Sequence, residues 1–264
     1  MRLLFIGDIV GKPGRRAVHE LLPGLIAERG IDFVVANGEN AAAGFGMTRE
    51  IVEDLFASQI DVLTTGNHVW DKKEILECID DYESLLRPAN YPVRVPGHGS
   101  VVMPVREGLQ VGVVNIMGRV FMRPLECPFR TAEREVEKIR SRTPVIIVDM
   151  HAEATSEKIA LGWFLDGRVT AVLGTHTHVQ TADDRILPNG TAYITDVGMT
   201  GPFDSVIGTR KEIILERFLS QLPNKFEVAK GDVRLQAVLI DVEEASGRAL
   251  GFERLSLPLR QEQG

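Results

Sequence analysis

Five short apolar runs, rich in β-branched residues, recur along the chain, and each predicts a buried strand. The runs occupy residues 3–6, 33–35, 62–63, 144–148 and 169–173. Helical apolar spacing separates the first three runs, with one helix predicted over residues 15–29 and another from a cap at Thr48 to about Ser58. This alternation of strands and helices favours a parallel sheet with both faces covered.

The pattern changes after residue 96. Two apolar runs at 101–105 and 111–116 flank a short polar turn, which predicts a β-hairpin. The last third is mostly β, with one amphipathic helix that opens on a predicted capping box of Thr209 and Glu212. Because no repeat or linker interrupts the chain, we predict one domain over residues 1–264, of the α/β class, with two mixed sheets packed together and helices outside.

Charge and cysteine content limit the classes of function. The net charge is −7 and the pI is near 5.5, which argues against an extended nucleic-acid surface but allows a local pocket for one phosphate. Cys78 and Cys127 are far apart, which favours reduced thiols. The N-terminal apolar run is too short for a signal peptide, and no transmembrane stretch is predicted. We expect a cytoplasmic protein with no membrane partner, and the sequence leaves a homo-oligomer open.

Side chains of the kinds that bind metal ions follow all five strand runs. They are Asp8, Glu39 with Asn40, Asn67 with His68, His151, and His176 with His178. Because ligands of open α/β sheets bind beyond the carboxyl ends of the strands, we expect these residues to converge. Without His68, the set holds two carboxylates, two amides and three imidazoles. That is more than one ion needs, and it suits two ions that share a carboxylate and clamp a phosphoryl group.

The run at 174–178 (GTHTH) places two histidines one residue apart. In extended backbone both rings would lie on one side, and the small neighbours would let a ligand come close. Taken alone, this pair favours loop histidines held by backbone hydrogen bonds over a metal site. Residues of the kinds that bind metal ions follow all five strands, and a role in stabilising turns does not readily explain all five. The set as a whole therefore favours the metal site. By the same geometry, His68 would point away from the ion bound by Asn67.

These motifs resemble those of the calcineurin-like metallophosphoesterase superfamily. The resemblance rests on the Gly7-Asp8 pair, the segments at 37–40 (NGEN), 66–68 (GNH) and 174–178, and His151. The segments at 7–14 (GDIVGKPG) and 196–208 (DVGMTGPFDSVIG) are similar to those of its YmdB-like branch. The resemblance covers nearly the whole chain. It implies an αββα sandwich, a binuclear iron or manganese centre, and hydrolysis of phosphodiesters, with 2′,3′-cyclic nucleotides as the substrate class.

The resemblance also implies a role for each residue. Asp8, Glu39, Asn40 and His178 would hold one ion, and Glu39, Asn67, His151 and His176 the other, with Glu39 bridging and His68 acting as an acid beside the centre. The chain departs from the superfamily pattern at two positions, since Val10 replaces a histidine and Glu39 replaces an aspartate. Asn40 would fill the place of the missing histidine. The oxygen-rich first site then leans towards iron or manganese over zinc.

Alternatives follow from the same residues. A phosphomonoesterase or nucleotidase would use the same centre, and a nucleotide-binding regulatory protein with little turnover is the alternative from another class. The complete ligand set and His68 favour catalysis. The glycines at 7, 11 and 14 lack dinucleotide-loop spacing. Asp149 is left open as a partner of His151 or a plain strand-end residue, and Lys158 is predicted to be solvated.

Overall fold

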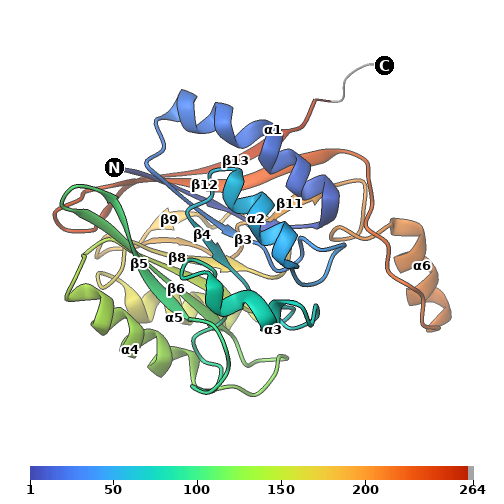
Figure 1. Cartoon of the computed structure of the whole chain (residues 1–264), viewed down its shortest axis with the longest axis horizontal. Helices are drawn as coiled ribbons and strands as arrows, with labels where there is room; N and C mark the ends of the chain where they lie inside the picture. The colour runs from blue at the N-terminus through green and yellow to red at the C-terminus, as the bar shows by residue number, and fades with distance from the viewer. Residues whose placement is uncertain (261–264) are drawn as a thin grey trace.

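The computed structural model describes residues 1–260 as two β-sheets packed face to face, with helices on their outer faces (Figure 1). The strands of the first sheet are β1 (Arg2–Ile6), β2 (Asp8–Ile9), β3 (Phe33–Asn37), β4 (Val62–Thr64), β11 (Met199–Pro202), β12 (Val233–Val242) and β13 (Ala249–Pro258). Their order is β2-β11-β12-β1-β3-β4, and β13 also pairs with β12. The β1, β3 and β4 strands run parallel, whereas β12 is antiparallel to β1 and β13, so the sheet is mixed.

The second sheet has six strands in the order β5-β6-β7-β8-β10-β9. Their bounds are β5 (Ser100–Arg106), β6 (Leu109–Met117), β7 (Ile146–His151), β8 (Ala171–Thr175), β9 (Arg185–Ile186) and β10 (Ala192–Ile194). The predicted hairpin is confirmed as antiparallel β5 and β6. Strands β6, β7, β8 and β10 are parallel, and β9 is antiparallel to β10, so this sheet is mixed as well.

The helices are α1 (Gly11–Arg29), α2 (Arg49–Ala57), α3 (Ile75–Cys78), α4 (Pro128–Arg140), α5 (Thr155–Leu165) and α6 (Lys211–Ser220), with a 3₁₀ turn at Ile79–Asp81. The Thr48 cap of α2 is confirmed, since its side chain accepts a hydrogen bond from the backbone of Ile51. The capping box predicted at Thr209 and Glu212 is wrong. The cap position of α6 is Arg210, which makes no side-chain capping bond, and the backbone of Thr209 pairs with Val206 and Val228 instead.

Alternation along the strands divides the core into three apolar layers, which is the physical basis of the αββα sandwich. In β1, Leu4 and Ile6 pack with residues of α1 and α2, whereas Leu3 and Phe5 face the other sheet. Ile147 of β7 meets them in this central layer. The outer face of the second sheet packs against α4 and α5. The predicted α/β sandwich of two mixed sheets is therefore confirmed.

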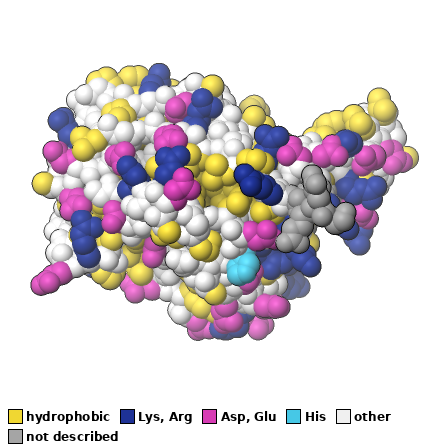
Figure 2. Space-filling model, turned by 90° about the horizontal axis from the view of Figure 1, so that it is seen from above, with side chains coloured by type: hydrophobic (Ala, Val, Ile, Leu, Met, Phe, Trp, Pro, Cys, Tyr) yellow, Lys and Arg dark blue, Asp and Glu magenta, His cyan; other side chains and the backbone are white. Residues whose placement is uncertain are grey.

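The outer surface and the hydropathy of the helices complete the description of the fold. The α6 helix projects from the body as an arm, and positive and negative side chains are interspersed over the face seen in Figure 2. Within residues 1–260, none of the helices combines the length and hydrophobicity that crossing a membrane requires.

Candidate metal centre

The imidazole of His151 lies at the middle of the predicted ligand set. Its Nε2 atom is 2.9 Å from Glu39 Oε1, 3.0 Å from Asn67 Oδ1 and 3.1 Å from His176 Nδ1. One ligand atom each of Glu39, His151 and His176 lie within 4.8 Å of one another. His151 is the last residue of β7, Asn67 follows β4, and His176 follows β8. The carboxyl ends of both sheets therefore deliver these four side chains to one point.

Asp8, Asn40 and His178 lie on the neighbouring side of the same cleft. Asp8 Oδ1 is 3.8 Å from His178 Nε2 and 4.0 Å from His151 Nδ1. Within residues 1–260, neither Asp8 Oδ1 nor Asn40 Oδ1 has a hydrogen-bond partner, although both atoms are buried. Leaving such oxygens unsatisfied costs free energy, whereas a bound cation would satisfy both. Both oxygens therefore have the chemistry of cation ligands.

Buried charge is concentrated at this point. Burial raises the pKa of Asp8 above its ordinary value. Burial alone would also raise the pKa of Glu39, but the neighbouring His151 imidazole lowers it to about 2. Burial alone would lower the pKa of His151, yet Glu39, Asp8 and Asp149 raise it to about 9. The proton on His151 thus offsets the negative charge of Glu39 and Asp8. A bound divalent cation could offset the same charge.

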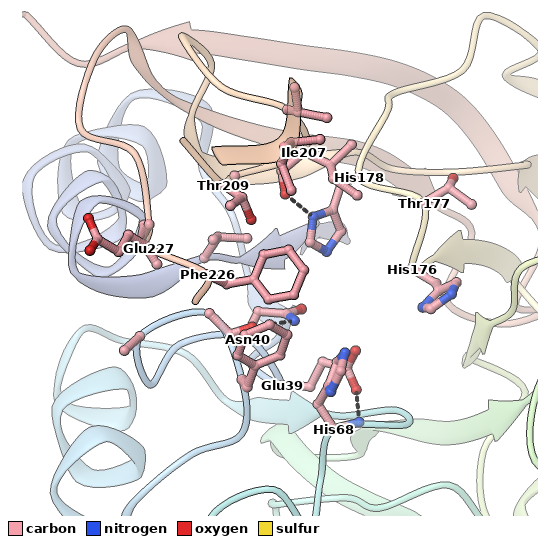
Figure 3. A pocket seen from close by; sticks show the side chains of 18 of the residues that line it. Glu39, Asn40, His68, His176, Thr177, His178, Ile207, Thr209, Phe226 and Glu227 are labelled. Atoms are coloured by element: carbon pink, nitrogen blue, oxygen red, sulfur yellow. Dashed lines mark hydrogen bonds between the residues drawn. The ribbon is translucent and has the colours of Figure 1, made fainter. Parts of the chain in front are cut away.

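The expectation of extended backbone through the His-Thr-His run is wrong. His176 has φ 100° and His178 has φ 63°, both in the left-handed region. The two rings therefore diverge, one towards His151 and one towards Asp8, as Figure 3 shows for their labelled side chains. Strained backbone of this kind persists only where surrounding contacts hold it. Here the backbone N–H of His176 donates to Asp8 Oδ2 over 3.1 Å.

The carboxylate of Asp196 also holds the His-Thr-His segment, through Thr177. Its Oδ2 atom accepts hydrogen bonds from the backbone N–H of Thr177 over 3.0 Å, from its hydroxyl over 2.7 Å, and from Lys158 Nζ over 2.8 Å. Lys158 is 0% exposed, so the expectation that it is solvated is wrong. The side chain of Lys158 points inward from α5 and pairs with the buried carboxylate of Asp196. A buried carboxylate left without such a partner would destabilise the fold. A side chain at Gly174 would collide with the backbone oxygen of Thr195, which explains the glycine that opens the run.

Hydrogen bonds also fix which ring nitrogen of His178 and of His151 faces the ligand cluster. His178 Nδ1 lies 2.9 Å from the carbonyl oxygen of Ile207, which can only accept, so Nδ1 carries the proton and Nε2 keeps its lone pair towards Asp8. The hydroxyl of Thr175 donates to Asp149 Oδ1 over 2.7 Å and lies 2.9 Å from His151 Nδ1. The Thr175 oxygen thus accepts from Nδ1–H of His151, so that Nε2 is the ring nitrogen that faces Glu39 and Asn67.

Asp149 is therefore a partner of His151 through Thr175, which settles the alternative left open by the sequence. Two features point to this partnership. Asp149 lies two residues before His151 in β7, and Thr175 of β8 lies opposite His151. Thr64 and Asn37 also donate hydrogen bonds to this carboxylate. Burial raises the pKa of this carboxyl group to about 6.

His68 lies beside the cluster. Its backbone N–H donates to Glu39 Oε2 over 3.0 Å, and its ring Nδ1 lies 2.8 Å from Asp71 Oδ2. Asn67 and His68 occupy a turn, so the expectation that rests on alternation in extended backbone does not apply to them. The ring nevertheless lines the cleft, edge-on to Phe45 with 5.0 Å between centroids.

The cleft in front of these residues has a volume of about 520 Å³ (Figure 3). Its lining combines the polar side chains of Glu39, Asn40, His176 and His178 with an apolar wall that includes Phe45, Phe226, Ile207 and Phe218. The sequence did not predict this apolar wall. Phe45 and Phe226 lie in irregular segments, where no periodic pattern marks them.

Comparison with known proteins agrees with this geometry. A family model described as YmdB-like protein matches residues 4–255. The chain is 51% identical over 255 residues to a 2′,3′-cyclic-nucleotide 2′-phosphodiesterase of Bacillus subtilis, covering 97% of this chain and 96% of that one. It is 34% identical over 267 residues to a putative phosphatase/phosphodiesterase of Mycoplasma genitalium, covering 99% and 95%.

Two solved structures share the whole fold. A hypothetical protein from Thermus thermophilus superposes with a TM-score of 0.91 at 44% identity, covering 98% of this chain and 99% of that one. A novel phosphatase from Mycoplasma pneumoniae gives the same TM-score at 34% identity, covering 98% and 93%.

Proposed function

The chain belongs to the YmdB-like family, whose relatives are phosphoester hydrolases, and on that basis we propose that it is a metal-dependent phosphodiesterase acting on nucleoside 2′,3′-cyclic phosphates. The observation that supports the proposal is the cluster of ligand atoms of Glu39, His151 and His176, together with buried oxygens of Asp8 and Asn40 that have no hydrogen-bond partner among residues 1–260. The identity with the Bacillus subtilis cyclic-nucleotide enzyme supports the substrate class.

In this proposal the centre would hold two ions, and Glu39 would be a ligand of both. Asp8, Asn40 and His178 complete one ligand set, and Asn67, His151 and His176 complete the other. The oxygen-rich first set favours iron or manganese. When bound, such ions stabilise charge on the phosphoryl group and supply a nucleophile at neutral pH. We also propose that residues 1–264 form one domain, and that the free thiols of Cys78 and Cys127 belong in the cytoplasm.

Hydrolysis of the cyclic ester joins a water oxygen to phosphorus and breaks the bond from phosphorus to one ribose oxygen, which takes up a proton. His68 supplies that proton, because its ring lines the cleft next to the ligand cluster without belonging to it. Asp71 orients the ring through Nδ1, so that Nε2 is the atom that donates. Phe45 and Phe226 give the cleft an apolar wall beside this ring.

The test of the function is a substrate comparison on metal-analysed protein. We expect turnover of 2′,3′-cyclic AMP, and a higher kcat/KM on bis-p-nitrophenyl phosphate than on p-nitrophenyl phosphate. A doubly charged monoester needs added cations, yet Arg217 is the sole Lys or Arg among the residues that line the cleft within 1–260. The guanidinium of Arg87 donates hydrogen bonds to three backbone carbonyl oxygens, those of Pro96, Pro88 and Val95. Preference for the monoester would establish the phosphomonoesterase alternative, and turnover of none of the three would favour a binding protein.

His68→Ala should separate the roles of this histidine. Nitrophenolate leaves without a proton, whereas a ribose oxygen needs one, and general acid catalysis of this kind contributes about 10²-fold or more. With metal content unchanged, we expect kcat on 2′,3′-cyclic AMP to fall by about 10²-fold and kcat on bis-p-nitrophenyl phosphate to change little. An equal loss on both substrates would assign His68 to charge stabilisation, and no loss on either would leave it a purely structural residue.

A further inference from the structure

A second, basic pocket adjoins the cleft of the metal centre. It has a volume of about 670 Å³ and is lined by four cations, Lys12, Arg15, Arg16 and Lys230, with Glu227 as the one acid among its lining residues within 1–260. The two pockets share Ala43, Phe226, Glu227 and Val228 in their walls, so they are neighbours. Nothing in the proposed hydrolysis of a mononucleotide uses this second pocket.

The start of α1 connects the two pockets rigidly. Asp8 lies in the metal centre, Val10 lines the cleft, and Lys12 lines the basic pocket, all within one short stretch of chain. The backbone N–H of Gly11 donates to the carbonyl oxygen of Asn40 over 2.9 Å, which ties this stretch to the ligand loop. The backbone of Lys12 is therefore held at a fixed place relative to the metal centre.

The charge of the basic pocket is only partly offset. Arg15 lies 3.2 Å from Asp54, and Arg16 lies 3.6 Å from Glu20, in partly exposed pairs. No ion pair found within residues 1–260 involves Lys12 or Lys230. Glu227 is engaged by Arg210 over 2.9 Å. In a chain of net charge −7, such a local excess of positive charge favours an anionic ligand beside the cleft.

Aromatic side chains stand between the basic pocket and the metal centre. Phe226 lies between His178 and Asn40 in Figure 3, and its ring centroid is 6.0 Å from that of Phe45. Arg217 Cζ lies 4.9 Å from the Phe226 centroid. A positively charged groove next to aromatic rings is the usual means of holding single-stranded nucleic acid, with phosphates on the cations and bases on the rings.

We propose that the basic pocket binds the phosphates of single-stranded RNA whose 3′ end carries a 2′,3′-cyclic phosphate, so that the enzyme acts on RNA ends. This inference rests on the proposed function and extends it. A 2′,3′-cyclic phosphate requires the 2′-hydroxyl, which RNA has and DNA lacks. In such an end the terminal phosphate lies at the metal centre, and the chain continues from the 5′ oxygen through further phosphates. Those phosphates pass Phe226 into the basic pocket, which needs only a short groove and no extended nucleic-acid surface.

The test compares 2′,3′-cyclic AMP with a pentaribonucleotide that ends in a 2′,3′-cyclic phosphate. We expect a higher kcat/KM on the pentanucleotide at low salt. Its logarithm should fall more steeply with the logarithm of salt concentration, by about 0.7 for each phosphate contact. Lys12→Gln with Lys230→Gln should lose about tenfold more kcat/KM on the pentanucleotide than on the mononucleotide, as expected from lost phosphate contacts. Fluorescence anisotropy with metal-free protein and the labelled 3′-phosphate product should show the same loss of binding.

A matched control removes two cations elsewhere, by Arg134→Gln with Lys138→Gln on α4. This variant carries the same change of net charge and should behave as the wild type on both substrates. Equal salt dependence on both substrates, or equal loss in the two double variants, would overturn the RNA-end proposal while leaving the cyclic phosphodiesterase standing. Turnover of neither substrate by the metal-loaded wild type would instead overturn the function on which it rests.

Discussion

Glu39→Ala is expected to remove both metal ions and nearly all activity. Glu39 is 1% exposed, and it has one carboxylate oxygen 2.9 Å from His151 and the other bonded to the backbone of His68, so both of its oxygens are held inside the cluster. Loss of the several kcal/mol of charge stabilisation that metal ions provide corresponds to a fall in kcat of about 10³-fold or more. Elemental analysis of protein reconstituted anaerobically with iron or manganese gives the metal content, and assays on bis-p-nitrophenyl phosphate give the rate.

His178→Ala is the matched comparison. It removes a ligand from the Asp8 side alone, since His178 Nε2 faces Asp8 whereas His151, His176 and Asn67 meet on the other side. We expect this variant to keep close to one ion per chain. If both variants lost metal equally, the assignment of ligands to two separate positions would be wrong. Wild-type protein that takes up one ion or none after reconstitution would contradict a binuclear centre.

Lys158→Ala is expected to destabilise the protein by about 3–5 kcal/mol, the usual cost of leaving one member of a buried ion pair alone. Both Lys158 and Asp196 are 0% exposed, and their atoms are 2.8 Å apart. The loss should also weaken metal binding, because Asp196 anchors Thr177 between the two histidine ligands. Urea unfolding of metal-free protein measures the first effect without the added stability that bound metal gives.

The exposed pair of Lys211 and Asp204 supplies the control for this prediction. Lys211→Ala should leave the urea midpoint nearly unchanged, because water already solvates both groups of an exposed pair. Lys158→Met, which keeps much of the side-chain volume, should still destabilise the fold, since it leaves Asp196 without its cation. A wild-type midpoint for Lys158→Ala would show that water, rather than the lysine, satisfies Asp196.

The fold was largely predictable because its signals are local. Short apolar runs rich in β-branched residues marked the strands, and a polar residue after each run marked the site edge, as at Asp8 and His151. The cap at Thr48 was also local and is confirmed. The prediction of a capping box at Thr209 and Glu212 was wrong because the backbone of Thr209 forms strand-like bridges to Val206 and Val228 in place of the cap.

The sequence by itself determined the class of fold, the set of candidate ligands and the family, since each depends on residue types at short spacing. Only the tertiary structure decided how those residues face one another. The positive φ of His176 and His178 turns their rings apart, and it is held by contacts with Asp8 and Asp196, which lie far along the chain. The burial of Lys158 likewise depends on where β8 and the loop after β10 come to lie. A sequence pattern records neighbours along the chain, whereas burial and hydrogen-bond partners are set by contacts across it.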